Sequence, residues 1–98
     1  MTTGNWDDQV RELVLNRFPA EEYKVFMYGS RATGKAKKWS DYDVGVMGNE
    51  RLVPKDRLVA LRGDLEESSL PVLVDVVDFN KVNDDFKKVA MEKVVWWS

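Results

Sequence analysis

The segment of residues 23–47 constrains the fold of this chain more than any other part of the sequence. Both of its ends are short runs rich in aromatic and β-branched residues, which predict two β-strands. The polar middle begins with Gly29 and Ser30, where the first strand ends, and closes with Asp41 and Asp43, where the second begins. The segment therefore predicts a strand, a glycine turn and an acidic strand that share one polar site.

Two well-known loop motifs approach parts of this segment, and both fail. The letters GSRATGKA approach a phosphate-binding P-loop, but the Ser or Thr that should follow Lys35 and bind Mg²⁺ is replaced by Ala36. A calcium-binding EF-hand that began at Asp41 would place Gly45 at its fifth position and Leu52 at its twelfth, where oxygen ligands are required. The segment predicts a site of another kind.

The two aspartates of the second strand predict a metal site. Residues two apart on a strand share a face, so Asp41 and Asp43 point the same way, with Cα atoms about 6–7 Å apart. A third carboxylate, Asp75, interrupts the apolar run of residues 71–77, which predicts a buried, central strand. An ionised carboxylate buried there costs several kcal/mol unless it is paired or bound to a metal ion.

A simpler interpretation stays open for each carboxylate. Asp41 and Asp43 are then solvated turn residues, and Asp75 faces water on an edge strand. Asp78 comes three residues later, so it faces the other way and is expected to cap the following turn. The combination of a glycine turn, paired aspartates and a third aspartate on a later strand favours the metal site.

The turn before the aspartates predicts a phosphate site. Gly29 has no Cβ and lets the main chain approach a phosphate, while Ser30 and the amides of a short helix from about Arg31 can hold its oxygens. The guanidinium of Arg31 also suits phosphate, although an ion pair with a nearby carboxylate would explain it equally. A basic loop follows, which either attracts a triphosphate or a nucleic-acid end or is merely solvated. Its members are Lys35, Lys37 and Lys38.

Hydrophobic periodicity predicts the remaining elements. Helices are expected over residues 6–18, 56–68 and about 81–94, with Asn5 capping the first. The element order is α-β-β-α-β-α, which indicates one α+β (α/β) domain over residues 1–98, a mixed sheet of three to four strands flanked by helices. The inward side of the last helix is predicted to hold Val82, Phe86, Val89 and Ala90.

The composition limits the chemistry. The 98 residues contain no cysteine and no histidine, which excludes thiol nucleophiles, disulfides, imidazole bases and Cys or His metal ligands. The formal net charge is −2, and without a basic excess a nucleic-acid partner is disfavoured. No apolar run approaches the ~20 residues that span a bilayer, and the N-terminus lacks signal-peptide features. We expect a cytoplasmic protein without a membrane partner.

Gly29-Ser30, ten intervening residues and then Asp41-x-Asp43 resemble the GS-x10-D-x-D signature of the nucleotidyltransferase superfamily related to DNA polymerase β. With the later VDVVDF, almost the whole chain is similar to the minimal nucleotidyltransferases of prokaryotes. The resemblance implies transfer of AMP from ATP to a hydroxyl group with release of pyrophosphate, with Mg²⁺, expected as two ions, or Mn²⁺ as cofactor. It implies that the catalytic and metal-binding residues are Asp41, Asp43 and Asp75, and that the phosphate-binding residues are Gly29, Ser30 and Arg31.

Many members of this family are similar to antitoxins encoded beside a HEPN-domain toxin, where the acceptor is a toxin tyrosine that becomes AMPylated. The resemblance therefore implies a separate acceptor protein of the HEPN toxin kind, and it leaves homo- or hetero-oligomers open. Two alternatives are a binding module that neutralises its partner without catalysis and nucleotidyl transfer to RNA. Trp96, Trp97 and Trp39 are candidates for an exposed interface, or the first two cover the end of the sheet.

Overall fold

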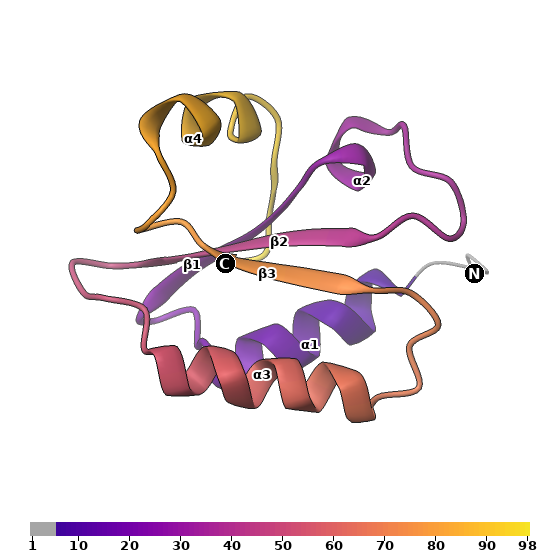
Figure 1. Cartoon of the computed structure of the whole chain (residues 1–98), viewed down its shortest axis with the longest axis horizontal. Helices are drawn as coiled ribbons and strands as arrows, with labels where there is room; N and C mark the ends of the chain where they lie inside the picture. The colour runs from indigo at the N-terminus through magenta and orange to yellow at the C-terminus, as the bar shows by residue number, and fades with distance from the viewer. Residues whose placement is uncertain (1–5) are drawn as a thin grey trace.

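The computed structural model describes residues 6–98 and consists of a four-stranded β-sheet with helices on both faces (Figure 1). The expected N-cap Asn5 lies outside the described residues. Along the chain the elements are α1 (Asp7–Arg17), β1 (Tyr23–Tyr28), α2 (Ser30–Thr33), β2 (Tyr42–Gly48), α3 (Lys55–Glu67), β3 (Val74–Asp78), α4 (Asp84–Ala90) and β4 (Val95–Trp96). The α+β architecture is confirmed. It includes α2, the short helix expected from about Arg31, and adds the two-residue β4, which was not predicted.

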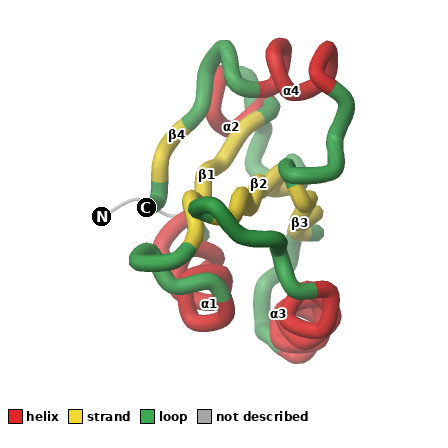
Figure 2. The backbone as a smooth tube through the Cα atoms, turned by 90° about the vertical axis from the view of Figure 1, so that its left-hand side faces the viewer, coloured by secondary structure: helices red, strands yellow, loops and turns green. Residues whose placement is uncertain are grey.

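The sheet is mixed and has the strand order β3-β2-β1-β4. β1 runs antiparallel to β2 and to β4, whereas β2 and β3 are parallel and are connected through α3. Helices α1 and α3 lie on one face of the sheet, and α2 and α4 lie on the other (Figure 2). No helix within residues 6–98 is long and apolar enough to cross a membrane.

The main core fills the space between the sheet and the helices α1 and α3. Alternate residues of β2, namely Tyr42, Val44 and Val46, are fully buried in it, because residues two apart on a strand share a face. The two helices are also joined by Arg17, which donates two hydrogen bonds to Asp64 at 2.7 and 3.1 Å. This layer leaves the intervening residues of β2 for the opposite face.

A smaller aromatic cluster lies on that opposite face, beneath α4. Phe26, Tyr28 and Phe79 form its centre, and the ring centroids of Phe26 and Phe79 are 4.8 Å apart. Gly45 of β2 makes room for it, because a Cβ there would lie 2.3 Å from the Phe26 ring. Asp43, two residues earlier on the strand, points to this same face.

The prediction of a central third strand is wrong, because β3 lies at the edge of the sheet beside β2. Leu73, just before it, is 74% exposed, and Asp75 is exposed as well. A continuous apolar run usually indicates a strand buried on both faces. At this edge, the strand is buried only at Val76, which faces the main core.

Helix α4 is shorter than predicted and packs differently. The side chain of Asn83 accepts a hydrogen bond from the Phe86 amide at 2.8 Å, so the helix begins after this cap. Val82 and Ala90 pack against the aromatic cluster as predicted. Phe86 also faces the cluster as predicted, with its ring centroid 6.1 Å from that of Tyr28 and 5.8 Å from that of Phe79, although the residue stays 43% exposed. The inward orientation predicted for Val89 is wrong, because this residue is 66% exposed. A seven-residue helix covers the cluster with one edge and leaves the rest of its apolar side in solvent.

The two C-terminal tryptophans differ in their surroundings. Trp97 packs against the main core, and its amide donates to the carbonyl of Val25 at 2.8 Å. Trp96 meets the ring of Phe26 edge to face at 5.2 Å but stays 50% exposed. Trp97 therefore covers the core, whereas Trp96 offers half of its surface to solvent.

Candidate active site

The strand register brings the three predicted aspartates to one end of the sheet. Asp43 of β2 and Asp75 of β3 are register partners in the parallel pair, so their side chains leave the same face. Asp41 immediately precedes β2, and the next amide, that of Tyr42, donates to the carbonyl of Leu73 at 2.9 Å. The aspartates are neighbours along two adjacent strands.

The glycine turn touches the middle carboxylate of this set. Gly29 follows β1 with φ 77° and ψ −156°, a conformation that is essentially restricted to glycine. A Cβ at this position would lie 2.3 Å from Oδ2 of Asp43, so a side chain does not fit. The predicted phosphate-binding turn is therefore in direct contact with Asp43, one of the two aspartates predicted to bind metal.

Repulsion among the carboxylates acts on Asp43. Partial burial raises the pKa of Asp43, and the negative charges of Asp75 and Asp41 raise it further. Tyr28, the register partner of Asp43 on β1, has its pKa raised to about 12 by burial and by the charges of Asp43 and Asp75. A cation at this end of the sheet would relieve the repulsion, and carboxylate oxygens are the ligands that Mg²⁺ and Mn²⁺ prefer.

The exposure of Asp75 corrects the expectation of a buried carboxylate that requires a partner. Its relation to the site depends on its register with Asp43 rather than on burial. Within residues 6–98, no three acidic side chains are placed closely enough to surround one metal ion. The donor set fits a divalent cation chemically, and the exposed side chains of Asp41 and Asp75 have to turn toward Asp43 to share one.

Helix α2 begins directly at the glycine turn. The amides of Ala32 and Thr33 both donate to the carbonyl of Gly29 at 3.1 Å, and Gly34 ends the helix in the left-handed conformation. Ser30 is the first residue of this helix and is partly buried. It follows Gly29 immediately and so lies next to the contact with the carboxylate site.

The described contacts of Arg31 do not include the ion pair with a carboxylate that the sequence suggests as one role, and its phosphate-binding role stays a prediction. Its Nε and Nη2 donate to the carbonyl of Ser40 at 3.1 and 2.8 Å, and Nη2 also donates to the carbonyl of Lys38 at 3.1 Å. Its guanidinium carbon lies 4.0 Å from the ring centroid of Tyr42. These partners are main-chain carbonyls and an aromatic face, rather than a carboxylate.

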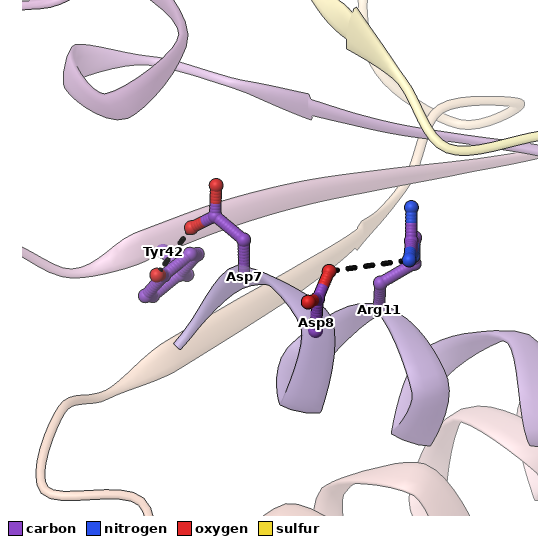
Figure 3. Close-up of polar contacts among 4 residues, drawn as sticks. All are labelled: Asp7, Asp8, Arg11 and Tyr42. Carbon is purple, nitrogen blue, oxygen red and sulfur yellow. Dashed lines mark hydrogen bonds and ion pairs between the residues drawn. The ribbon is translucent and has the colours of Figure 1, made fainter. Parts of the chain in front are cut away.

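Tyr42 supports the site in a way that the sequence analysis missed. Its hydroxyl donates to Asp7 at 2.5 Å (Figure 3). The ring is fully buried, and the hydroxyl also accepts from the Trp6 amide at 3.1 Å. Burial, and then the bond to Asp7, raises the pKa of Tyr42 to about 12. The strand between Asp41 and Asp43 is thereby tied to the start of α1. A buried tyrosine usually has a partner for its hydroxyl, and this was the signal available in the sequence.

The loop between α2 and β2 presents positive charge and an aromatic surface. Trp39 is 61% exposed and stacks on Trp6 with ring centroids 5.7 Å apart. The ammonium of Lys38 lies 5.0 Å from the centroid of Trp39, and Lys35 and Lys37 are exposed as well. This basic loop leads directly into Asp41.

An apolar groove of about 410 Å³ opens between α2 and α4. Gly29 and Tyr28 lie on one side of it, and the exposed Phe86 and Val89 lie on the other. Since Gly29 contacts Asp43, the groove adjoins the carboxylate site.

Comparison with known proteins yields one family, a curated relative and several solved structures of similar fold. The family model described as "Nucleotidyltransferase domain" matches residues 7–97. The "Probable protein adenylyltransferase MntA" of Haemophilus influenzae is 39% identical over 76 residues, which cover 76% of this chain and 64% of that protein. The chain therefore spans less than two thirds of the length of this relative.

Two solved structures share the fold. A toxin–antitoxin structure with AMP-PNP has a TM-score of 0.73 at 18% identity and covers 94% of this chain and 72% of its own. A mutant of a toxin–antitoxin named MntA-HpeT has a TM-score of 0.72 at 16% identity, with the same coverage of 94% and 72%. At this level of identity, the likeness concerns the fold.

Proposed function

This chain belongs to the nucleotidyltransferase domain family, and from that premise we propose that it transfers AMP from ATP to a hydroxyl group of another molecule. The observation that carries the proposal is the contact between Gly29 and Asp43, where a Cβ would lie 2.3 Å from the carboxylate. It joins a turn suited to phosphate with carboxylates suited to a divalent cation. Nucleotidyl transfer needs both parts within reach of one triphosphate.

The glycine turn would hold the phosphates of ATP. Gly29 allows a phosphate to approach the main chain closely, and Ser30 offers its hydroxyl and its amide at the start of α2. The exposed lysines of the following loop add longer-range attraction for a polyanion.

Asp41, Asp43 and Asp75 would hold the divalent cations. The expected occupants are two Mg²⁺ ions, or Mn²⁺. When bound, the metal neutralises the charge that develops on the phosphate oxygens. The pKa of Asp43 is raised first by partial burial and then by the charges of Asp75 and Asp41, and a cation would balance that negative charge.

The reaction joins the acceptor oxygen to the α-phosphorus and breaks the bond from that phosphorus to the bridging oxygen of the β-phosphate. Pyrophosphate leaves with the electron pair of the broken bond. A base has to accept the hydroxyl proton, and we assign this role to Asp75. Its exposed carboxylate can then release the proton to water.

A tyrosine of a separate HEPN-type toxin is the proposed acceptor. The relative from Haemophilus influenzae is named a protein adenylyltransferase, and both similar structures are of toxin–antitoxin proteins. β3 forms the edge of the sheet with Asp75 exposed, and the groove at Gly29 opens nearby, so a second protein can approach the carboxylates. Because such a reaction uses cellular ATP, we also propose a cytoplasmic location.

A binding module that acts without catalysis is the second candidate function. The exposed apolar side chains favour it, because they offer a contact surface that needs no nucleotide: Trp39, Phe86, Val89 and Trp96. A third candidate, nucleotidyl transfer to RNA, is favoured by the lysines beside the exposed Trp39, since nucleic-acid sites combine positive charge with stacking surfaces.

Incubation with ATP labelled at the α-phosphate, Mg²⁺ and either a HEPN-type toxin or a short RNA separates the three functions. Label on the toxin that Asp43→Asn abolishes supports the proposed activity, and label on the RNA supports the third candidate. Toxin neutralisation by Asp43→Asn without any labelled product supports the binding module. Wild-type protein that labels no acceptor at saturating ATP and Mg²⁺ overturns the proposed activity.

A further inference from the structure

Arg31 holds the residues on both sides of Asp41. It donates two hydrogen bonds to the carbonyl of Ser40, at 3.1 and 2.8 Å, and its guanidinium carbon lies 4.0 Å from the ring centroid of Tyr42. A third bond reaches the carbonyl of Lys38 at 3.1 Å. One side chain therefore fixes the main chain before Asp41 and the aromatic ring after it.

Asp41 depends on such contacts because it lies just outside β2. The described hydrogen bonds between β2 and the segment before β3 begin with the amide of Tyr42. Before Asp41, the chain forms a tight turn, in which the Ser40 amide donates to the Lys37 carbonyl at 3.1 Å. The amide of Lys37 donates to Oγ of Ser40 at 2.8 Å. This turn closes on itself, and Arg31 connects it to α2.

The aromatic face beneath Arg31 is itself fixed. The Tyr42 ring is fully buried, and its hydroxyl is held by Asp7 at 2.5 Å and by the Trp6 amide at 3.1 Å. A guanidinium over such a face is bound by cation–π attraction as well as by its hydrogen bonds. The position of Arg31 is therefore determined by the core, and it transmits that position to the Ser40 carbonyl.

We propose that Arg31 is a positioning residue, which holds Ser40 and Tyr42 so that the Asp41 carboxylate between them can turn toward Asp43 and share a metal ion with it. The proposal rests on the proposed function, because it treats Asp41 as part of the metal site. A planar fork recognises phosphate with two parallel donors, and here Nε and Nη2, which form one such pair, both bind the Ser40 carbonyl. Arg31, which follows the Gly29-Ser30 turn, thus links that turn to the segment that carries Asp41 and Asp43.

Two substitutions separate positioning from phosphate binding. Lysine keeps the charge, but one ammonium cannot reproduce a planar fork that binds two carbonyls and covers a ring. A positioning role predicts that Arg31→Lys behaves like the neutral Arg31→Met. A phosphate-binding role predicts that Arg31→Lys restores most of the affinity for a polyphosphate.

The experiment measures Mn²⁺ binding to nucleotide-free protein by electron paramagnetic resonance, and amide hydrogen exchange over residues 37–42. We expect both variants to bind Mn²⁺ about tenfold or more weakly. We also expect faster exchange in this segment and unchanged affinity for metal-free tripolyphosphate. Arg51→Lys is the matched control, because Arg51 donates to Glu22 at 2.7 Å and lies 6.0 Å from the Tyr23 ring centroid, at the other end of the sheet.

Wild-type Mn²⁺ affinity and wild-type exchange in both variants would overturn the proposal. It would also be overturned if Arg31→Met lost tripolyphosphate binding and Arg31→Lys restored it. Unfolding of both variants in circular dichroism would overturn it as well, because the effect would then not be specific to Asp41. Wild-type protein that binds no Mn²⁺ would count against the proposed function instead. In that case, the exchange measurement still decides whether Arg31 holds the segment.

Discussion

Asp43 and Asp75 lie directly opposite each other on the parallel strands β2 and β3, and their side chains leave the face away from the main core, because the next residues, Val44 and Val76, are buried in that core. Neighbouring strands are about 4.8 Å apart, so two negative charges at this register repel each other. This repulsion contributes to the raised pKa of Asp43. Carboxylates arranged in this way reduce the stability of the protein alone and favour binding of a cation.

The substitution Asp43→Asn is expected to stabilise the metal-free protein while abolishing its activity. The folded-state pKa of Asp43 is raised, so ionisation of this group opposes folding once the pH exceeds its unfolded value of about 3.9. The variant should therefore unfold at a higher temperature at pH 7, and the difference should vanish below about pH 3.9. AMP transfer should fall about 100-fold or more. Equal stability at pH 7 would contradict the predicted repulsion.

The substitution Asp64→Asn is expected to destabilise the protein in a pH-dependent manner. Hydrogen bonds from Arg17, at 2.7 and 3.1 Å, lower the pKa of Asp64 below its usual value. A lowered folded-state pKa contributes stability above the unfolded value of about 3.9, and that stability is lost as the pH falls through the folded value. Thermal unfolding should thus differ between variant and wild type at pH 7 and converge in acid.

Asp8→Asn is the control for this pair, because Asp8 also binds an arginine, Arg11, at 3.2 Å but has a 94% exposed side chain. Exposed pairs contribute little, so we expect almost no change at any pH. A similar change in both variants would show that net charge, rather than the link between α1 and α3, causes the effect.

The part of the site formed by residues 29–43 could be predicted from the sequence, because the spacing of its residues along two paired strands fixes their positions in the fold. Gly29 and Ser30 end one strand and Asp41 and Asp43 begin the next, and antiparallel pairing returns the chain to the same end of the sheet. The strand period of two then decides that Asp43 faces away from the main core. These relations need no knowledge of distant parts of the chain.

The long-range part could not be predicted in the same way. The apolar run before Asp75 does not reveal whether its strand is central or at an edge, since strand order depends on which elements pack on the other side. The partners of Arg31 were also hidden, because a guanidinium suits phosphate, carboxylate and carbonyl alike. Arg31 binds the carbonyls of Lys38 and Ser40 because the folded loop passes close to α2, which the sequence does not reveal.

The substitution Tyr42→Phe is expected to destabilise the fold by about 1 kcal/mol or more, because it removes the hydroxyl that binds Asp7 and the Trp6 amide. The ring itself stays in the core, so packing is retained. Urea unfolding measures the loss. Tyr23→Phe is the matched control: this ring is equally buried, but its hydroxyl accepts only a long bond of 3.4 Å from Arg57 among the described contacts. An equal loss in both variants would contradict a specific role for the Tyr42 network.

The substitution Gly29→Ala is expected to cost more stability than Gly34→Ala and, unlike it, to abolish activity. Both glycines have positive φ, but Gly34 has the left-handed helical conformation, in which alanine is strained by about 1–2 kcal/mol, whereas the ψ of −156° at Gly29 gives a conformation that is essentially restricted to glycine. At Gly34 an added Cβ meets nothing within 4 Å, whereas at Gly29 it would lie 2.3 Å from Oδ2 of Asp43. Urea unfolding and AMP transfer by the two variants measure the difference. The contact between turn and carboxylate would be contradicted if Gly29→Ala were no less stable than Gly34→Ala and kept wild-type transfer.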